Sequence, residues 1–222
     1  MKSKKLELFK DYNLYCLTAE NLSCGRSNVD VVKEMLSAGV KIIQYREKKK
    51  TLREKFKEAL ILRDLTAKYD ALLIINDHLD LTKIVEADGV HIGQEDYPLE
   101  VVREFLGEKF IVGITVHRKE EVIDAIAKGA DYLGLGPLFE SFTKEKPHPP
   151  IGLEILEWAV NNFEIPIVAI GGIKESNLPK VLEKGGKCVA LVSEIVSSPN
   201  IEEKIQKIMK ILEVYKYGKN NS

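Results

Sequence analysis

Short apolar runs alternate with longer amphipathic segments along the chain. The runs are rich in Ile, Val and Leu, and the chain between neighbouring runs is long enough for one helix. They cover Leu14–Leu17, Lys41–Tyr45, Leu72–Ile75, Gly89–Ile92, Phe110–Ile114, Tyr132–Leu135, Ile167–Ile170 and Cys188–Val192. Continuous apolar strands of this kind are typical of a parallel sheet that is buried on both faces.

The intervening segments carry helix signals. Glu54 follows Thr51 at the spacing of a capping box, which predicts that a helix begins there. A last helix is expected to begin after Pro199 and Asn200. The apolar residues expected on the buried face of the first of these helices are Leu52, Phe56, Ala59 and Leu60.

Repeated strand–helix units predict an α/β protein built as a single (β/α)8 TIM barrel, with residues 1–222 forming one domain. No linker or low-complexity segment divides the chain. A doubly wound open sheet is the alternative fold. The glycine fingerprint of dinucleotide-binding sheets is missing after the first strand, which favours the barrel.

Composition narrows the class of protein. The formal net charge is -1, whereas non-specific nucleic-acid binding needs a basic excess. No apolar run approaches the length of about 20 residues that spans a bilayer, and the N-terminus lacks a signal-peptide core. The three cysteines, Cys16, Cys24 and Cys188, show no metal-ligand spacing and indicate reduced thiols in the cytoplasm. Whether the chain forms a homo-oligomer is left open.

Polar residues collect at the predicted strand ends, where barrel enzymes place their active sites. Three cations, Arg46, Lys48 and Lys144, converge with the carboxylates Asp77 and Asp96 on this rim. Carboxylates beside substrate phosphates are typical Mg²⁺ ligands, so we expect chemistry on a pyrophosphate or on two phosphates. Backbone N–H groups after the last two strands, at Gly172 and at Val192–Ser193, could bind a phosphate.

Each of these signals has a structural alternative. Gly172 could serve only as a turn residue, and Asp77 could cap the helix that follows it. His91 is expected in the barrel wall, and His117 and His148 have no obvious partners.

These residues form motifs that resemble those of the thiamine-phosphate synthase (thiamine-phosphate pyrophosphorylase) family, in the same order and with similar spacing from about Leu14 to Ile195. The motifs are Gln44-Tyr45-Arg46-Glu47-Lys48, Ile75-Asn76-Asp77, Gly89 to Asp96, Gly134-Leu135-Gly136-Pro137, Thr143-Lys144, Gly171-Gly172-Ile173 and Val192-Ser193. The resemblance implies a barrel enzyme that joins a hydroxymethylpyrimidine diphosphate to a thiazole phosphate and releases pyrophosphate.

The resemblance also implies residue roles. Asp77 and Asp96 would bind Mg²⁺, and the cations would have the catalytic role of neutralising the leaving pyrophosphate. The pyrimidine diphosphate would contact Gln44, Tyr45, Arg46, Glu47, Lys48, Asn76, Thr115 and Lys144. The thiazole phosphate would contact Ser141, Phe142, Thr143, Gly172, Val192 and Ser193.

The chain departs from the family pattern in one loop. The family usually has Pro-Thr-x-Thr-Lys where this chain has Glu140 to Lys144, so an unexpected anion stands beside a phosphate site. Two alternative functions remain. A related thiazole tautomerase would place a His where Pro137 stands, and a non-catalytic phosphate-binding regulator would lack one of the charged residues.

Overall fold

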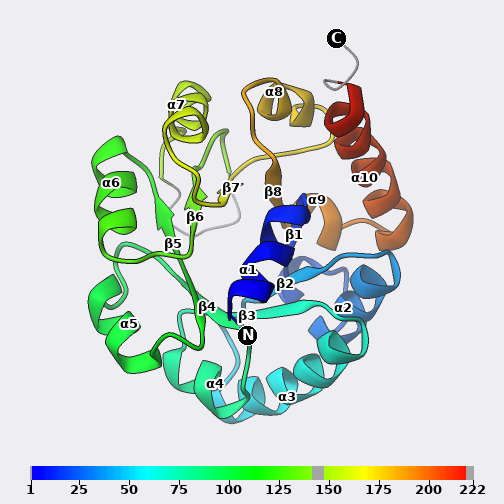
Figure 1. The fold of residues 1–222 in the computed structure, drawn as a ribbon. Coiled ribbons are helices and arrows are strands. Elements are labelled where there is room, and N and C mark those ends of the chain that lie inside the picture. The colour runs from blue at the N-terminus through cyan, green and yellow to red at the C-terminus, as the bar shows by residue number, and fades with distance from the viewer. Residues whose placement is uncertain (1, 142–147, 219–222) are drawn as a thin grey trace.

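The computed structural model describes residues 2–141 and 148–218, and its centre is a closed barrel of parallel strands. Each strand pairs with its neighbours in sequence, and β1 pairs with β8, placing Tyr15 opposite Ala190. The sheet therefore closes on itself (Figure 1), which confirms the barrel and rules out the open doubly wound sheet. The strands are β1 (Leu14–Leu17), β2 (Ile42–Tyr45), β3 (Leu72–Asn76), β4 (Gly89–Ile92), β5 (Ile111–Val116), β6 (Tyr132–Leu135), β7 (Ile167–Ala169) and β8 (Cys188–Leu191).

Helices surround the barrel and cover its outer face (Figure 1). A short 3₁₀ turn, η1 (Glu20–Leu22), follows β1. The helices are α1 (Lys2–Asp11), α2 (Asn28–Ser37), α3 (Leu52–Lys68), α4 (Leu79–Ile84), α5 (Leu99–Leu106), α6 (Lys119–Ala127), α7 (Glu154–Asn162), α8 (Leu178–Glu183), α9 (Ser193–Val196) and α10 (Ile201–Gly218).

Helix α3 begins as expected but buries a different face. Thr51 and Glu54 form the capping box, and α10 begins directly after Asn200. Of the four apolar residues expected on its buried face, only Ala59 is buried, whereas Leu52, Phe56 and Leu60 are exposed. The face that packs on the barrel also has helical spacing, so the docking of the helix and not the apolar pattern decides which face is buried. The buried residues of α3 are Lys55, Ala59, Leu62 and Thr66.

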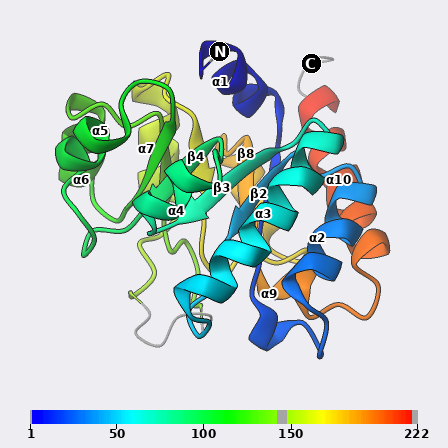
Figure 2. The same cartoon turned by 90° about the horizontal axis from the view of Figure 1, so that it is seen from below.

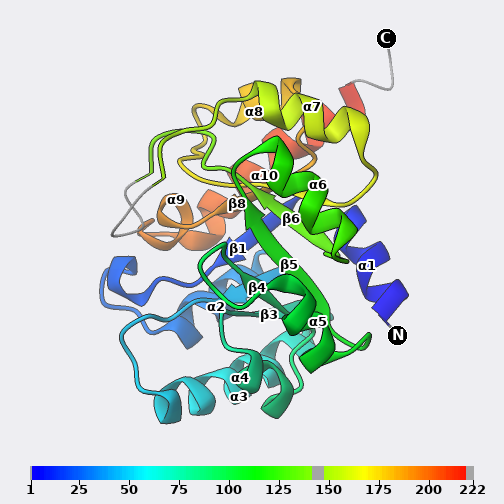
Figure 3. The same cartoon turned by 90° about the vertical axis from the view of Figure 1, so that its left-hand side faces the viewer.

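Helix α1 closes the end of the barrel at which the strands begin. Figures 2 and 3 place it at the opposite end from α9. Its Phe9 is 1% exposed and packs against the ring of Tyr132, with 4.5 Å between the ring centroids. Lys5 of the same helix forms an ion pair with the buried Asp88, which also receives a 2.7 Å bond from Arg63. The far end, where the strands finish, is left for a binding site.

The strands carry one apolar layer on each face. The outer layer packs under the helices, and the inner layer fills the barrel from Phe9 upward. Inward-facing residues become polar toward the strand ends, where Gln44, His91 and Thr115 are all buried. None of the helices in the described parts of the chain is long and apolar enough to cross a membrane.

Candidate active site

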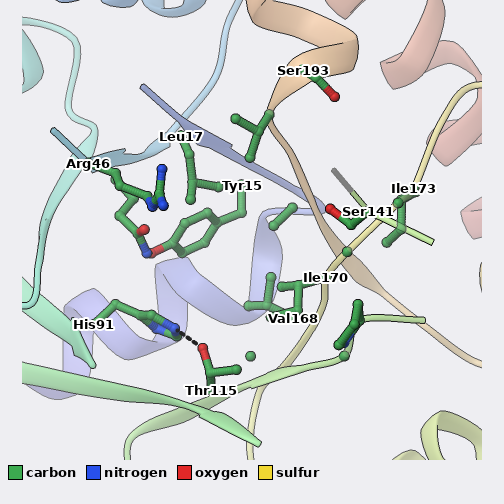
Figure 4. A pocket seen from close by; sticks show the side chains of 18 of the residues that line it. Tyr15, Leu17, Arg46, His91, Thr115, Ser141, Val168, Ile170, Ile173 and Ser193 are labelled. Carbon is green, nitrogen blue, oxygen red and sulfur yellow. Dashed lines mark hydrogen bonds between the residues drawn. The ribbon is translucent and has the colours of Figure 1, made fainter. Parts of the chain in front are cut away.

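A cavity of about 380 Å³ opens at the strand ends of the barrel. Its size is in the range of small-molecule sites. Arg46 and Ser141 line it from opposite sides, and His91 and Thr115 lie near its floor (Figure 4). The position agrees with the expectation that the site lies at the carboxyl ends of the strands.

Residues at the end of β2 alternate between the cavity and the barrel exterior, as a strand requires. Gln44 and Arg46 line the cavity. Tyr45 instead points outward, and its hydroxyl donates a 2.6 Å hydrogen bond to Glu58 of α3. Glu47 accepts bonds from the Asn28 side chain and the Lys49 amide. The structure therefore places Tyr45 and Glu47 behind the cavity wall, where they support the loop.

The backbone of Arg46 is held on both sides by Thr18. The Thr18 hydroxyl donates to the Arg46 carbonyl at 3.0 Å and accepts from the Arg46 amide at 2.8 Å. Thr18 is fully buried, and nothing in the sequence pattern pointed to it. Partial removal of the guanidinium from water lowers the pKa of Arg46, and this effect is opposed by the charges of Asp77 and Glu47. An arginine in this setting is suited to binding an anion.

Asp77 and Asp96 are neighbouring carboxylates that follow β3 and β4. The pKa of Asp96 is raised, first by its removal from water and then by the negative charge of Asp77. The Gly93 amide donates to Asp96 at 2.7 Å, and Lys48 forms a 2.6 Å ion pair with Asp77. The carboxylates predicted to share one metal ion thus lie together beside a cation.

The backbone of Asp77 is shaped by the turn that ends β3. Its φ is +63°, in the left-handed region that Asp tolerates better than most residues. Its amide donates to the carbonyl of His91 at 2.9 Å. The side chain is not a helix cap, because the residue before α4 is His78.

The donor set fits Mg²⁺ only when a substrate supplies further ligands. No group of three or more His, Cys, Asp or Glu side chains that could hold a metal occurs among residues 2–141 and 148–218. Phosphate oxygens and water would therefore complete the coordination of an ion held by the two carboxylates, which is the usual manner of Mg²⁺ binding at phosphate sites.

The opposite side of the cavity is lined by residues predicted for the thiazole phosphate. Ser141, Gly172, Val192 and Ser193 all line it, and Ser193 begins α9. Gly172 has φ +67°, and a Cβ there would lie 2.3 Å from the carbonyl oxygen of Glu140. The structure thus supports the turn interpretation of Gly172, whatever its amide binds.

Several cavity residues were not predicted. His91 lies in β4 as expected, but its ring points into the cavity rather than into the wall, and it is bonded to Thr115. Glu140, the anion that the sequence sets beside the phosphate site, also lines the cavity. The rings of His117 and His148 stack 4.2 Å apart at its edge, so each has the other as a partner. Side chains along β4 alternate between the inside and the outside of the barrel, and this alternation could have revealed His91. The histidine stack joins two separate loops, so the pattern along the chain does not predict it.

The remaining predicted residues divide into two sets. Asn76 and Thr115 line the cavity. Phe142, Thr143 and Lys144 lie outside the described residues, so their roles stay predictions.

Known proteins resemble this chain over nearly its whole length. The family described as thiamine monophosphate synthase matches residues 14–195. The thiamine-phosphate synthase of Dictyoglomus turgidum is 71% identical over 218 residues, covering 98% of each chain. That of Caldicellulosiruptor saccharolyticus is 61% identical over 96% of this chain and 97% of its own.

A solved structure agrees with these sequences. Thiamine phosphate pyrophosphorylase from Pyrococcus furiosus superimposes with a TM-score of 0.86 at 36% identity, covering 94% of this chain and 98% of that one. The sequence motifs, the cavity and these matches lead to one conclusion: the chain belongs to the thiamine monophosphate synthase family.

Proposed function

We propose that the cavity is where the protein joins a pyrimidine-methyl diphosphate to a thiazole phosphate, giving thiamine phosphate and pyrophosphate. The observation that carries this proposal is a cluster of opposite charges beside the cavity. Arg46 lines the cavity and feels the charge of Asp77, which forms an ion pair with Lys48 and raises the pKa of Asp96. Two cations and two neighbouring carboxylates suit a diphosphate bound together with a divalent cation.

The pyrimidine end of the first substrate would enter the barrel and the diphosphate would stay at the rim. Gln44, Asn76 and Thr115 supply hydrogen-bonding groups along the cavity. Arg46 and Lys48 would contact the diphosphate, together with Lys144, which the sequence places in the same role. Tyr45 and Glu47 would act from behind the wall, by holding the loop that carries the two cations.

Asp77 and Asp96 would hold one Mg²⁺ with the diphosphate oxygens. When bound, the ion supplies charge neutralisation for the leaving pyrophosphate. Lys48 already neutralises part of the carboxylate pair, which keeps both carboxylates beside each other before substrate arrives. Arg46 adds a second positive charge, close enough to Asp77 to feel its charge.

The reaction would proceed by loss of pyrophosphate and capture by the thiazole. The bond between the methylene carbon and the phosphate oxygen breaks, and its electron pair leaves with pyrophosphate. The thiazole nitrogen then donates its lone pair to that carbon, so no proton has to be removed. Catalysis therefore rests on positioning and on stabilising the charge that develops at the rim, where Arg46 lies.

The second substrate would lie across the cavity from Arg46. Ser141, Gly172, Val192 and Ser193 would hold its phosphate. Glu140 is an anion on this side, and Lys174, which also lines the cavity, provides a compensating cation. We place the reaction in the cytoplasm, in keeping with the free thiols of Cys16, Cys24 and Cys188.

Pyrophosphate release tests the proposal directly. Both substrates are mixed with the protein and Mg²⁺, and pyrophosphate is measured against reactions that lack one substrate. We expect release only when both substrates are present. Isomerisation of a thiazole without pyrophosphate would indicate the tautomerase, and binding of phosphates without turnover would indicate the regulator.

A further inference from the structure

A chain of buried hydrogen bonds crosses the barrel along the wall of the cavity. The Gln44 amide nitrogen donates to the Tyr15 hydroxyl at 2.8 Å, and the hydroxyls of Tyr15 and Tyr132 lie 2.9 Å apart. His91 Nδ1 lies 2.9 Å from the Tyr132 hydroxyl, and its Nε2 lies 2.8 Å from Thr115 Oγ1. The five side chains come from β2, β1, β6, β4 and β5. All five residues line the cavity, including the two ends of the chain, Gln44 and Thr115.

Packing holds the two phenol rings in place. Phe9 lies against Tyr132 from below. On the other side, a Cβ at Gly113 would lie 2.0 Å from the Tyr132 ring, so the glycine makes room for it. Burial raises the pKa of both Tyr15 and Tyr132 far above the neutral range, so each hydroxyl keeps its single proton.

The proton arrangement of the chain follows from its first donor. The NH₂ group of Gln44 can only donate, so the Tyr15 oxygen accepts. Tyr15 is 1% exposed, so its own proton needs an acceptor inside the protein. Within the described residues, that acceptor is the Tyr132 hydroxyl. Reversing that bond would leave a buried hydroxyl proton unpaired, which is costly.

The same reasoning extends to the cavity. The Tyr132 proton is donated to Nδ1 of His91, so the imidazole proton sits on Nε2 and is donated to Thr115 Oγ1. A hydroxyl that accepts this bond has its own proton left to donate. Figure 4 shows the Thr115 hydroxyl turned toward His91 at the floor of the cavity.

We propose that Tyr15 and Tyr132 are positioning residues that act through His91 to present the Thr115 hydroxyl as a hydrogen-bond donor to the substrate. The group recognised would be a ring atom with a lone pair, such as a ring nitrogen of the pyrimidine. The identity of this substrate rests on the proposed function, whereas the proton arrangement does not. Tyr132 has the central place, because its hydroxyl joins the Gln44–Tyr15 half of the chain to the His91–Thr115 half.

A double-mutant cycle separates this role from general packing. Tyr132→Phe removes the linking hydroxyl and keeps the ring, and we expect kcat/KM for the pyrimidine diphosphate to fall about tenfold with the KM for thiazole phosphate unchanged. Thr115→Val removes the proposed donor, whereas Thr115→Ser keeps it and should retain activity. In the Thr115→Val background, Tyr132→Phe should cause little further loss. Losses that multiply in the double variant would overturn the proposal.

Nitrogen NMR of the imidazoles tests the proton arrangement without any substrate. The chain has 4 histidines, so the ring signals of His91 can be assigned by substitution. We expect the Nε2–H tautomer in the unaltered protein and a mixture of tautomers in Tyr132→Phe. Phe9→Leu, which changes the packing under Tyr132 and removes no hydrogen bond, should leave the tautomer unchanged.

The two readouts keep the proposals apart. An Nδ1–H tautomer in the unaltered protein would overturn the proposed chain even if the enzyme turns over normally. An Nε2–H tautomer in a protein that releases no pyrophosphate would retain the chain and reject the proposed function.

Discussion

Thr18 shows how a single buried hydroxyl can set the position of a functional side chain. Its oxygen both donates to and accepts from the backbone of Arg46. Thr18→Val keeps the shape of the side chain and removes both bonds, which leaves buried backbone groups of Arg46 unpaired. We expect kcat/KM for the pyrimidine diphosphate to fall about tenfold, equivalent to 1.4 kcal/mol.

Thr66→Val is the matched control for this substitution. Thr66 is also fully buried and its hydroxyl donates at 3.0 Å to the carbonyl of Arg63, within α3 and away from the cavity. It should lower the melting temperature and leave the kinetic constants unchanged. Equal kinetic effects of the two variants would show that Thr18 contributes only stability.

Asp96 provides a second residue-scale prediction, which concerns the metal. Asp96→Asn removes one charge and keeps an oxygen that can accept from the Gly93 amide. We expect the Mg²⁺ concentration for half-maximal rate to rise at least about tenfold, with a lower kcat. Steady-state rates across a Mg²⁺ titration measure this, with Asp124→Asn on the exposed face of α6 as control. An unchanged Mg²⁺ requirement in both Asp96→Asn and Asp77→Asn would remove these residues from the metal site.

The sequence located residues at the strand ends better than the contacts between strands. Arg46 and Asp77 stand directly after β2 and β3, where a barrel places its chemistry, so chain position alone located them. The contact of Tyr15 with Tyr132 joins strands far apart in the chain, and that of His91 with Thr115 joins two consecutive strands. Such contacts depend on strand register and on which face each residue occupies, and neither follows from one apolar run.

At the scale of elements, the turn after β7 depends on Gly172. Its φ is +67° and the space where a Cβ would lie is filled by the backbone of Phe139 and Glu140. Gly172→Ala should therefore destabilise the protein by about 1–3 kcal/mol and weaken both substrates through the displaced loop. Thermal unfolding and separate binding titrations of the two substrates measure these effects.

Gly107→Ala measures what a positive φ alone costs when a residue gains a Cβ, without a steric clash. Gly107 has a similar φ of +73°, and a Cβ there would meet nothing within 4 Å. We expect it to lower the melting temperature less than Gly172→Ala does. A selective loss of thiazole phosphate binding in Gly172→Ala, with stability unchanged, would instead support a direct contact between the phosphate and the backbone.

Helix α1 was not predicted from the sequence pattern. Its segment, from Lys2 to Asp11, is polar on average and shows little of the stripe that marks a packed helix, because it docks mainly through Phe9. The strands were predicted to within two residues because both of their faces are buried, which leaves continuous apolar runs. A helix that plugs a barrel end has no comparable periodic signature.

Phe9→Ala tests whether α1 is an integral part of the barrel. The ring fills the floor between Tyr15 and Tyr132, so its removal should leave a cavity and cost about 3–5 kcal/mol of unfolding free energy. Phe105→Ala makes the same deletion on α5, where the ring is 47% exposed, and should cost far less. Denaturant unfolding measures both, and similar losses would show that α1 adds little to the core.

At the scale of the whole molecule, the residues that stabilise the barrel and those proposed to bind ligands lie at opposite ends of its axis. The lower end is closed by α1 and the apolar inner layer. The upper end holds the cavity and the paired charges, and Lys48 is held at Asp77 rather than by the core. Substitutions at the rim should therefore change ligand binding with little effect on unfolding, whereas those at the floor should change stability first.

This separation makes ligand-dependent stability a test of the assembled site. Because Asp77 and Asp96 supply only two carboxylates, we expect Mg²⁺ and pyrophosphate to bind well only together. At a ligand concentration about 100 times Kd, binding adds about 2.7 kcal/mol to the unfolding free energy. For a chain of this size that corresponds to a rise of about 5–10 °C in Tm.

Thermal unfolding would be measured with Mg²⁺ alone, with pyrophosphate and EDTA, and with both ligands. The joint shift should be lost in Asp77→Asn and kept in Asp124→Asn, whereas a full shift from pyrophosphate in EDTA would mean that the cations bind it without a metal.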